Sequence, residues 1–159
     1  MMNVNSPIGR LTAKVAGSAQ FAAVAPKIVP RIDRVLNRVT GGRFVLSGAL
    51  LPSLVLTTTG AKSGLQRETP LATMPDGDAF YIVGSNFGRE KHPAWTGNLI
   101  ADPNASVSYE HVETPVLSRL LTEQEKAEAW PKLIAVWPAY DDYVQSSGRD
   151  LRVFHLTPA

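Results

Sequence analysis

Two periods of hydrophobic residues divide the chain, and the change from one to the other falls near Leu54. In residues 31–39 the apolar side chains recur every three or four positions, which predicts an amphipathic helix. Pro30 precedes this segment and Gly41 follows it, as at the start and end of many helices. From Leu54 onward, short runs of apolar and β-branched residues predict strands instead. The predicted strands cover residues 54–59, 68–74, 79–85, 105–109, 114–121 and 151–156.

The segments between these strands predict how the strands are connected. Residues 75–78 read Pro-Asp-Gly-Asp, a turn sequence that makes the second and third strands a hairpin. Pro93 opens a short helix that runs to residue 100. Thr122 and Glu125 have the capping-box spacing in front of a longer helix that reaches Trp137. Antiparallel strands with helices set apart favour an α+β fold, most simply a β-barrel with helices packed on it.

The composition narrows the chemistry that the chain can perform. Its 159 residues are 44% hydrophobic and 19% charged, which is typical of a globular protein. Because the chain has no cysteine, disulfides, thiolate metal sites and thiol nucleophiles are excluded, and redox chemistry needs a bound organic cofactor. The three histidines lack ligand spacing, so we predict no metal site. Nucleic-acid binding is not expected, because no basic stripe is interleaved with aromatic residues.

The charge is distributed unevenly along the chain. The first 50 residues carry seven basic residues and one acidic residue, whereas the remainder is acidic. We therefore expect an N-terminal helical leader, residues 1–45, followed by a domain over residues 46–159. A basic, partly apolar leader can lie on an anionic membrane surface, and it can equally be a solvated helix face. No apolar run approaches the roughly 18 residues of a transmembrane helix. The expected location is cytoplasmic, with or without peripheral contact at the inner face of the cell membrane.

A loop between the first two predicted strands has the residue types of an anion site. Gly60 and Gly64 free the backbone there, and Lys62 and Arg67 bring two cations to the same loop. Exposed amides in a glycine-containing turn, together with these cations, suit a phosphate or a carboxylate. The loop lacks the spacing of a nucleotide P-loop and of a dinucleotide fingerprint. The alternative is a polar hairpin loop with two surface cations.

A second stretch, residues 85–95, runs from a strand end through a glycine loop to a helix start. The helix amides favour an anionic or electron-rich group, and Phe87 and Trp95 can supply flat apolar walls. Alternatively, both residues have structural roles only: Trp95 packs in the hydrophobic core, and His92 caps the helix start at the surface.

A third stretch ends the long predicted helix with three large aromatic residues, Trp137, Tyr140 and Tyr143. The two tyrosines share a face if this segment is helical. They are either core residues with satisfied hydroxyls or the roof of a pocket in which a phenol donates a hydrogen bond or a proton to a substrate that is being reduced.

The three stretches together resemble the motifs of the deazaflavin-dependent nitroreductase family, split-barrel oxidoreductases that use coenzyme F-420. The family's Gly-x-Lys-Ser/Thr-Gly-x-x-Arg-x-x-Pro-Leu motif stands here as residues 60–71. Its Ser-x-x-Gly loop and Pro-x-Trp-x-x-Asn-Leu motif stand as residues 85–88 and 93–99, and its Tyr-Pro-x-Tyr-x-x-Tyr motif as residues 137–143. The resemblance covers about two-thirds of the chain, from Leu54 to the end.

This resemblance implies a fold and an activity. The fold is a split β-barrel of the FMN-binding type, with N-terminal helices and with helices packed on the barrel. The activity is hydride transfer from reduced F-420 to an organic acceptor, such as a quinone, a nitroaromatic or an activated enone. FMN in the same fold and a non-catalytic protein that binds the cofactor or a lipid are the alternatives, and the oligomeric state stays open.

The resemblance also implies the site residues. Lys62, Ser63 and Arg67 clamp the phosphate and lactyl-glutamate tail of the cofactor, and its ring lies against the backbone of residues 83–86 and near Trp95. The expected cofactor-binding residues are Ala61, Lys62, Ser63, Arg67, Thr69, Pro70, Leu71, Val83, Gly84, Ser85, Asn86, Ala94, Trp95 and Asn98. The expected substrate-binding residues are Ala72, Trp137, Tyr140 and Tyr143, with Tyr140 as the catalytic candidate.

Three positions depart from the family pattern. Asn86 stands where members often carry a lysine, Ala72 where some present a tyrosine, and Trp137 in place of the first tyrosine of the aromatic motif. These differences concern the acceptor more than the cofactor.

Overall fold

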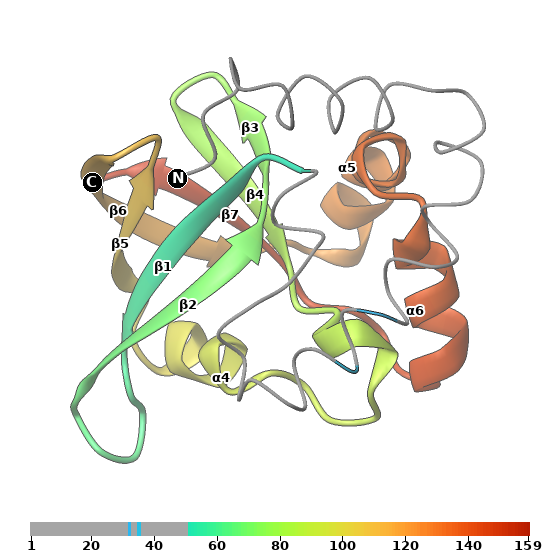
Figure 1. Ribbon diagram of the computed structural model, residues 1–159, viewed down its shortest axis with the longest axis horizontal. Coiled ribbons are helices and arrows are strands. Elements are labelled where there is room, and N and C mark those ends of the chain that lie inside the picture. Colours follow the sequence, from blue (N-terminus) through green and yellow to red (C-terminus); the bar gives the residue numbers. More distant parts are fainter. Residues whose placement is uncertain (1–31, 33–34, 36–50) are drawn as a thin grey trace, which may run out of the picture. The chain divides into compact units, whose positions relative to one another are not determined.

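A computed structural model describes Ile32, Val35 and residues 51–159 (Figure 1). The strands are β1 (Ser53–Thr59), β2 (Gln66–Ala72), β3 (Met74–Asp76), β4 (Ala79–Val83), β5 (Asn104–Tyr109), β6 (Val112–Leu120) and β7 (Val153–Pro158). The helices are the 3-10 turn η1 (Asn86–Gly88) and the α-helices α4 (Ala94–Ala101), α5 (Glu123–Val136) and α6 (Ala139–Ser147). The predicted strands, apart from the one over residues 68–74, and the helices after Pro93 and Thr122 are thereby confirmed.

All seven strands belong to one antiparallel sheet in the order β2-β1-β5-β6-β7-β4-β3. The sheet curls strongly into a half-barrel, which makes the fold an α+β split barrel (Figure 1). Its two edge strands, β2 and β3, are consecutive in the chain and are separated only by Thr73. The Thr73 amide donates to the Pro52 carbonyl at 2.8 Å, and its hydroxyl donates to the Tyr81 carbonyl at 3.0 Å. Thr73 therefore joins the two edges of the sheet.

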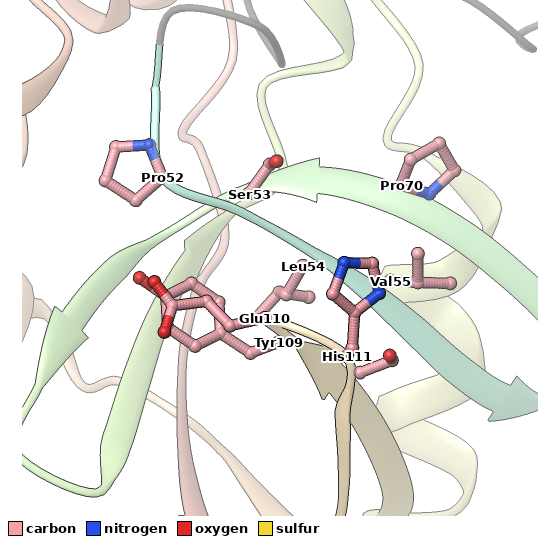
Figure 2. A pocket seen from close by; sticks show the side chains of 9 residues that line it. Pro52, Ser53, Leu54, Val55, Pro70, Tyr109, Glu110 and His111 are labelled. Carbon is pink, nitrogen blue, oxygen red and sulfur yellow. The ribbon is translucent and has the colours of Figure 1, made fainter. Parts of the chain in front are cut away.

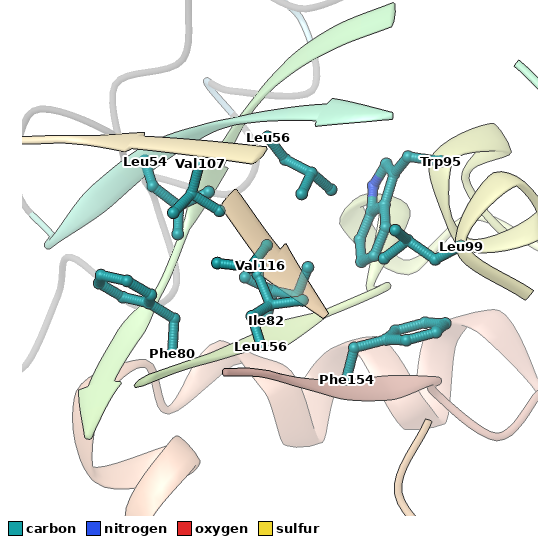
Figure 3. Packing of buried hydrophobic residues seen from close by; sticks show 10 residues of the cluster. All are labelled: Leu54, Leu56, Phe80, Ile82, Trp95, Leu99, Val107, Val116, Phe154 and Leu156. Atoms are coloured by element: carbon teal, nitrogen blue, oxygen red, sulfur yellow. The ribbon is translucent and has the colours of Figure 1, made fainter. Parts of the chain in front are cut away.

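The core fills the concave side of this sheet (Figure 3). Strand periodicity explains it, since alternate residues of β1 are buried while those between them are half-exposed. Helix α4 adds Trp95 and Leu99 from one end of the barrel, where the indole packs 5.7 Å from the Phe154 ring. The buried cluster consists of Leu54, Leu56, Phe80, Ile82, Trp95, Leu99, Val107, Val116, Phe154 and Leu156.

The structure differs from the predicted elements in two places. The predicted strand over residues 68–74 breaks at Thr73, so its main part pairs with β1, and only the short β3 forms the hairpin with β4. The predicted long helix ends at Val136, and a separate helix, α6, follows Pro138. Proline lacks the amide that would continue the ladder of α5, and its fixed φ suits a helix start.

The N-terminal leader lies almost entirely outside the described residues. The chain divides into two units, Met1–Leu46 and Ser47–Ala159. Of the predicted helix over residues 31–39, the structure describes Ile32 and Val35, and both are helical. Within the described residues, no helix has the length and apolar character needed to cross a membrane.

Candidate functional site

The loop between β1 and β2 is closed by its own backbone. The Gly60 amide donates to the Leu65 carbonyl and the Gly64 amide to the Gly60 carbonyl, each at 2.8 Å. Gly64 adopts a left-handed φ of +68°, which glycine tolerates without strain. A Cβ at Gly60 would lie 2.6 Å from the Ser63 hydroxyl oxygen, so the serine side chain needs a glycine beneath it. The two glycines thus fix a compact loop.

This loop leaves donors free at its tip. Among the residues that the structure describes, the backbone amides of Lys62 and Ser63 have no hydrogen-bond partner. Within the same part of the chain, neither Lys62 nor Arg67 forms an ion pair, and both side chains are exposed. Lys62 and two free amides on the loop, with Arg67 at the start of β2, form an arrangement that can bind an anion through charge and hydrogen bonds together.

Asn98 of α4 braces the loop from below. Its side-chain oxygen accepts from the Ala61 amide at 3.0 Å, and its side-chain nitrogen donates to the Thr58 hydroxyl at 3.1 Å. Thr58 is buried at the end of β1. One asparagine therefore joins strand, loop and helix, and explains why the predicted site residues Ala61 and Asn98 come together.

The end of β4 meets α4 and the start of β7 at Gly84. The Gly84 amide donates to the Arg152 carbonyl at 2.8 Å. A Cβ at Gly84 would lie 2.8 Å from the Thr96 methyl and 3.3 Å from the Arg152 carbonyl oxygen. The Arg152 guanidinium donates to the Thr96 hydroxyl at 3.0 Å. The backbone of Val83 and Gly84 is thus fixed directly beside the first turn of α4, which carries Ala94 and Trp95.

Residues 84–92 form a strained loop after β4. Asn86, Phe87 and Gly88 have φ angles of 47°, 54° and 73°, so two consecutive non-glycine residues adopt the left-handed conformation. Such conformations cost of order 1–3 kcal/mol each and persist only where the surroundings fix them. Asn86 contributes by donating from its side chain to the Lys91 carbonyl at 2.8 Å.

The guanidinium of Arg149 binds this loop from the C-terminal end of α6. It donates to the carbonyls of Gly84, Ser85 and Arg89 at 3.0–3.1 Å, to the Lys91 carbonyl at 3.4 Å, and to Nδ1 of His92 at 3.0 Å. Burial and the charges of Arg152 and Arg149 lower the pKa of His92. Arg149 was not among the predicted site residues, because nothing in the local pattern of residues 148–152 marks an arginine that binds a loop about 60 residues away.

The three aromatic residues of the third stretch are buried. Trp137, Tyr140 and Tyr143 are each at most 6% exposed. The Tyr140 ring packs 6.2 Å from Trp130 and 6.3 Å from Tyr143. Tyr143 in turn lies against the loop, because a Cβ at Gly88 would be 3.2 Å from its ring. The two tyrosines do share a region of α6, and they connect it to the loop after β4.

Tyr140 has an unusual hydroxyl for a buried tyrosine. It forms no hydrogen bond with any residue in the described part of the chain. Burial raises the pKa of this hydroxyl well above its ordinary value. The phenol therefore stays protonated at neutral pH and can donate a hydrogen bond, but it cannot supply a phenolate.

The expected site residues of β2 lie on two different faces. Residues paired across antiparallel strands share a face, and Arg67, Thr69 and Leu71 pair with the inward residues Thr58, Leu56 and Leu54. The neighbouring residues Pro70 and Ala72 pair with Val55 and Ser53 on the outer face. The side chains of these two sets therefore cannot all contact one bound molecule.

The outer face of β1 carries a pocket of about 450 Å³ (Figure 2). It reaches from Pro52 and Pro70 to the turn between β5 and β6, where Glu110 and His111 both have left-handed φ angles. In Figure 2 the His111 ring stands over β1 beside Val55. Of the expected site residues, only Pro70 lines this pocket.

Hydrogen bonds and packing connect most of the other residues that were expected to bind cofactor or substrate, and we call this connected set of residues the strip. It runs from the loop at Lys62 through Asn98 and α4 to Gly84, and from there through Arg149 to α6. Trp95 belongs to this strip through α4, but its indole is a core anchor. Thr96, Arg149 and Arg152 complete the strip and were absent from the sequence prediction.

Comparison with known proteins agrees with these motifs. The family model described as "F420H2-dependent quinone reductase", F420H2 being the reduced form of coenzyme F-420, matches residues 29–158. The F420H2-dependent quinone reductase Rv1261c of Mycobacterium tuberculosis is 41% identical over 80 residues, which are 49% of this chain and 53% of that protein. The chain thus spans about half the length of these curated relatives.

Solved structures extend the likeness to the fold. The structure of an F420-H2 dependent reductase, FDR-A, is 33% identical with a TM-score of 0.61, over 66% of this chain and 93% of that one. A second structure, described as a domain-swapped dimer, is 32% identical with a TM-score of 0.62, over 79% of this chain and 93% of that one. The split barrel, the motif order and the match over residues 29–158 agree, and the chain belongs to the F420H2-dependent quinone reductase family.

Proposed function

We propose that this protein binds reduced coenzyme F-420 and reduces an organic acceptor, with a quinone as the first candidate. The observation that carries the proposal is the loop between β1 and β2, where Lys62 and two free amides lie on an anchored backbone and Arg67 follows at the start of β2. The tail of F-420, as implied by the family, carries a phosphate and carboxylates. These groups match the free donors in charge and in hydrogen-bonding type.

The fit of the tail depends on the bracing of the loop. A mobile loop would lose conformational freedom on binding, which weakens affinity. Asn98 and the internal bonds of Gly60 and Gly64 hold the loop before any ligand arrives. Arg67 lies on the inward face of β2, and Thr69 and Leu71 continue that face toward the barrel. The tail would therefore enter along this face, with Pro70 and Ala72 turned away from it.

The ring end of the cofactor is assigned to the backbone of residues 83–86. Gly84 and Ser85 lie there between α4 and the loop that Arg149 holds. When bound, reduced F-420 supplies a hydride. The protein's part is to fix the ring and the acceptor at contact distance and to exclude water, which converts an encounter into an oriented reaction.

Tyr140 is the proposed hydrogen-bond donor to the acceptor. Its side chain is buried, and its hydroxyl is protonated and without a partner in the described part of the chain, so an acceptor oxygen that gains negative charge could take its hydrogen bond. Tyr143 orients α6 against the loop rather than facing an open pocket.

The decisive experiment is a titration of the purified full-length protein with F-420, followed by fluorescence. We expect micromolar binding that weakens about tenfold in Lys62→Ala and in Arg67→Ala, as for the loss of a charged hydrogen-bond donor. Lys132→Ala is the matched control, since Lys132 is an exposed lysine on α5 far along the chain from the loop. Its affinity should equal that of the wild type.

A second measurement separates the alternatives. Oxidation of reduced F-420 by a panel of quinones, nitroaromatics and enones is followed by absorbance, with reduced FMN as the competing cofactor. Turnover with F-420 and not with FMN supports the proposal. Binding of F-420 without oxidation by any acceptor would make the protein a cofactor carrier, and absence of F-420 binding would refute the assignment. Whether the basic leader contacts membranes stays a separate prediction, which sedimentation with anionic liposomes can test.

A further inference from the structure

The side chain of Arg149 forms more hydrogen bonds than a surface arginine needs. It follows Gly148, the left-handed residue that ends α6. Its donors reach four backbone carbonyls and one imidazole nitrogen, and all of these acceptors belong to residues 84–92. Arginine has five N–H groups in a fixed planar fork, so a single side chain can hold several acceptors in one arrangement.

The loop needs such support from outside. Residues 84–92 are not paired with a neighbouring strand beyond Gly84, and two non-glycine residues in the loop are left-handed. The amides of Gly88 and Arg89 close only local bonds, to the Ser85 and Asn86 carbonyls at 3.0 and 3.1 Å. Together with the Ser146 hydroxyl, which donates to the Gly88 carbonyl at 3.4 Å, Arg149 supplies long-range bonds that select this conformation over others.

Arg149 also determines the state of His92. An arginine side chain only donates, so Nδ1 of His92 must be the acceptor and the ring proton must reside on Nε2. Burial lowers the pKa of His92, the positive charges of Arg152 and Arg149 lower it further, and Asp150 opposes them. The imidazole is therefore neutral at pH 7, in one tautomer, with its Nε2–H outside this bond.

We propose that Arg149 is the positioning residue for the ring end of the cofactor site: it holds residues 84–92 in the shape that receives the ring and fixes His92 as a neutral Nε2–H donor beside it. This inference rests on the proposed function. It also explains how α6 and the ring loop act together, since the arginine that binds the loop follows directly on the helix that carries Tyr140 and Tyr143.

The test compares two arginine-to-lysine variants. Arg149→Lys keeps the positive charge but removes the planar guanidinium group and its several N–H donors. Arg119→Lys makes the same change at a site on β6, where the side chain bonds Glu125 and not the loop. We expect Arg149→Lys to bind F-420 about tenfold more weakly and Arg119→Lys to bind like the wild type, because a lysine cannot reproduce the multiple bonds of the guanidinium.

A readout without the cofactor accompanies the titration. Nitrogen-15 NMR of the histidine ring reports the tautomer and the titration midpoint of His92, and His92→Gln identifies its signals. In the wild type we expect the Nε2–H tautomer with a midpoint below the ordinary value. In Arg149→Lys we expect a mixture of tautomers, with faster hydrogen exchange at the amides of Gly88 and Arg89 and unchanged exchange in the sheet.

The outcomes are distinguishable. If the wild type does not bind F-420, the proposed function fails, while the NMR and exchange data still test the hold of Arg149 on the loop. Wild-type affinity together with an unchanged His92 tautomer in Arg149→Lys would overturn the inference. Global unfolding of Arg149→Lys would also overturn it, because Arg149 would then support the whole fold rather than the loop.

Discussion

Gly84 has no room for a side chain, because two elements approach its α-carbon from different parts of the chain. The Thr96 methyl comes from α4 and the Arg152 carbonyl from the segment before β7. A glycine in an ordinary strand is a weak choice, since it costs conformational entropy on folding. A glycine is needed here because the end of β4 and the first turn of α4 approach each other closely at this α-carbon.

Gly84→Ala is expected to destabilise the protein by about 1–3 kcal/mol, because the new methyl overlaps Thr96 and the neighbouring backbone cannot move away easily. Gly97→Ala is the matched control on α4, since its Cβ would meet nothing within 4 Å. It should stabilise by about 0.5–1 kcal/mol through higher helix propensity. Urea unfolding followed by tryptophan fluorescence measures both. Equal effects of the two variants would contradict the close packing at Gly84.

Tyr140→Phe is expected to lower the turnover number about tenfold and to leave the affinity for F-420 within about twofold, since only the hydroxyl is removed. Tyr81→Phe serves as the control, because Tyr81 stacks on His155 on the outer side of the sheet, 4.4 Å between ring centroids. Steady-state rates with reduced F-420 and a quinone give the comparison. Unchanged turnover in Tyr140→Phe would remove this hydroxyl from the mechanism.

At the scale of elements, period and turn chemistry were sufficient to predict the strands. Alternating burial along β1 and the burial of β4 at every residue except Tyr81 reflect patterns that are visible in the sequence. Pairing order was not predictable in this way. The sequence placed residues 68–74 in a single strand, and nothing local indicates that Thr73 bonds Pro52 on one side and Tyr81 on the other.

The candidate site was predictable only where its motif is local. The loop of Lys62 and Arg67 could be recognised from its glycines and cations, because those residues are consecutive. Arg149 and Arg152 act on residues far away in the chain, and a single sequence holds no signal for such contacts. The two faces of β2 illustrate the same limit, since only the register with β1 separates Thr69 from Pro70.

The capping box of α5 gives a prediction for the pH dependence of stability. Glu125 bonds the Thr122 amide and accepts two bonds from Arg119, each at 2.7 Å. The Arg119 guanidinium, followed by the Thr122 donors, lowers the pKa of Glu125 from 4.5 to about 2. A lowered carboxyl pKa stabilises the folded state above the unfolded pKa, and this contribution is lost as the pH falls from about 4.5 toward 2.

Glu125→Gln should therefore lower the free energy of unfolding at pH 7 and flatten its decline between pH 4.5 and 2. Urea unfolding at a series of pH values gives both quantities. Glu90→Gln is the control, an exposed carboxylate in the loop after β4. The same acid slope in Glu125→Gln and in the wild type would show that the capping box does not control this pH range.

At the scale of the whole molecule, the half-barrel depends on one residue at the junction of its two edge strands. Thr73 is 2% exposed, and its hydroxyl satisfies the carbonyl of Tyr81 in β4 while its amide satisfies Pro52 beside β1. Exposed sheet edges invite pairing with other chains, so a covalent and hydrogen-bonded junction protects the sheet as well as closing it. The stability of this junction should therefore be coupled to the stability of the entire sheet.

Thr73→Val keeps the shape of the side chain and removes its donor, which leaves the Tyr81 carbonyl with one partner fewer at a part-buried position. We expect a loss of about 1–3 kcal/mol in the free energy of unfolding, in a single cooperative transition. Thr157→Val removes a comparable bond, from the Thr157 hydroxyl to the Leu117 carbonyl at 3.5 Å, at an exposed position of β7. Water replaces that bond, so the change should stay within about 0.5 kcal/mol. If Thr73→Val instead loosened only β3 in hydrogen exchange and left global unfolding unchanged, the sheet would be stable without its junction, and the two edges would have to be regarded as independent.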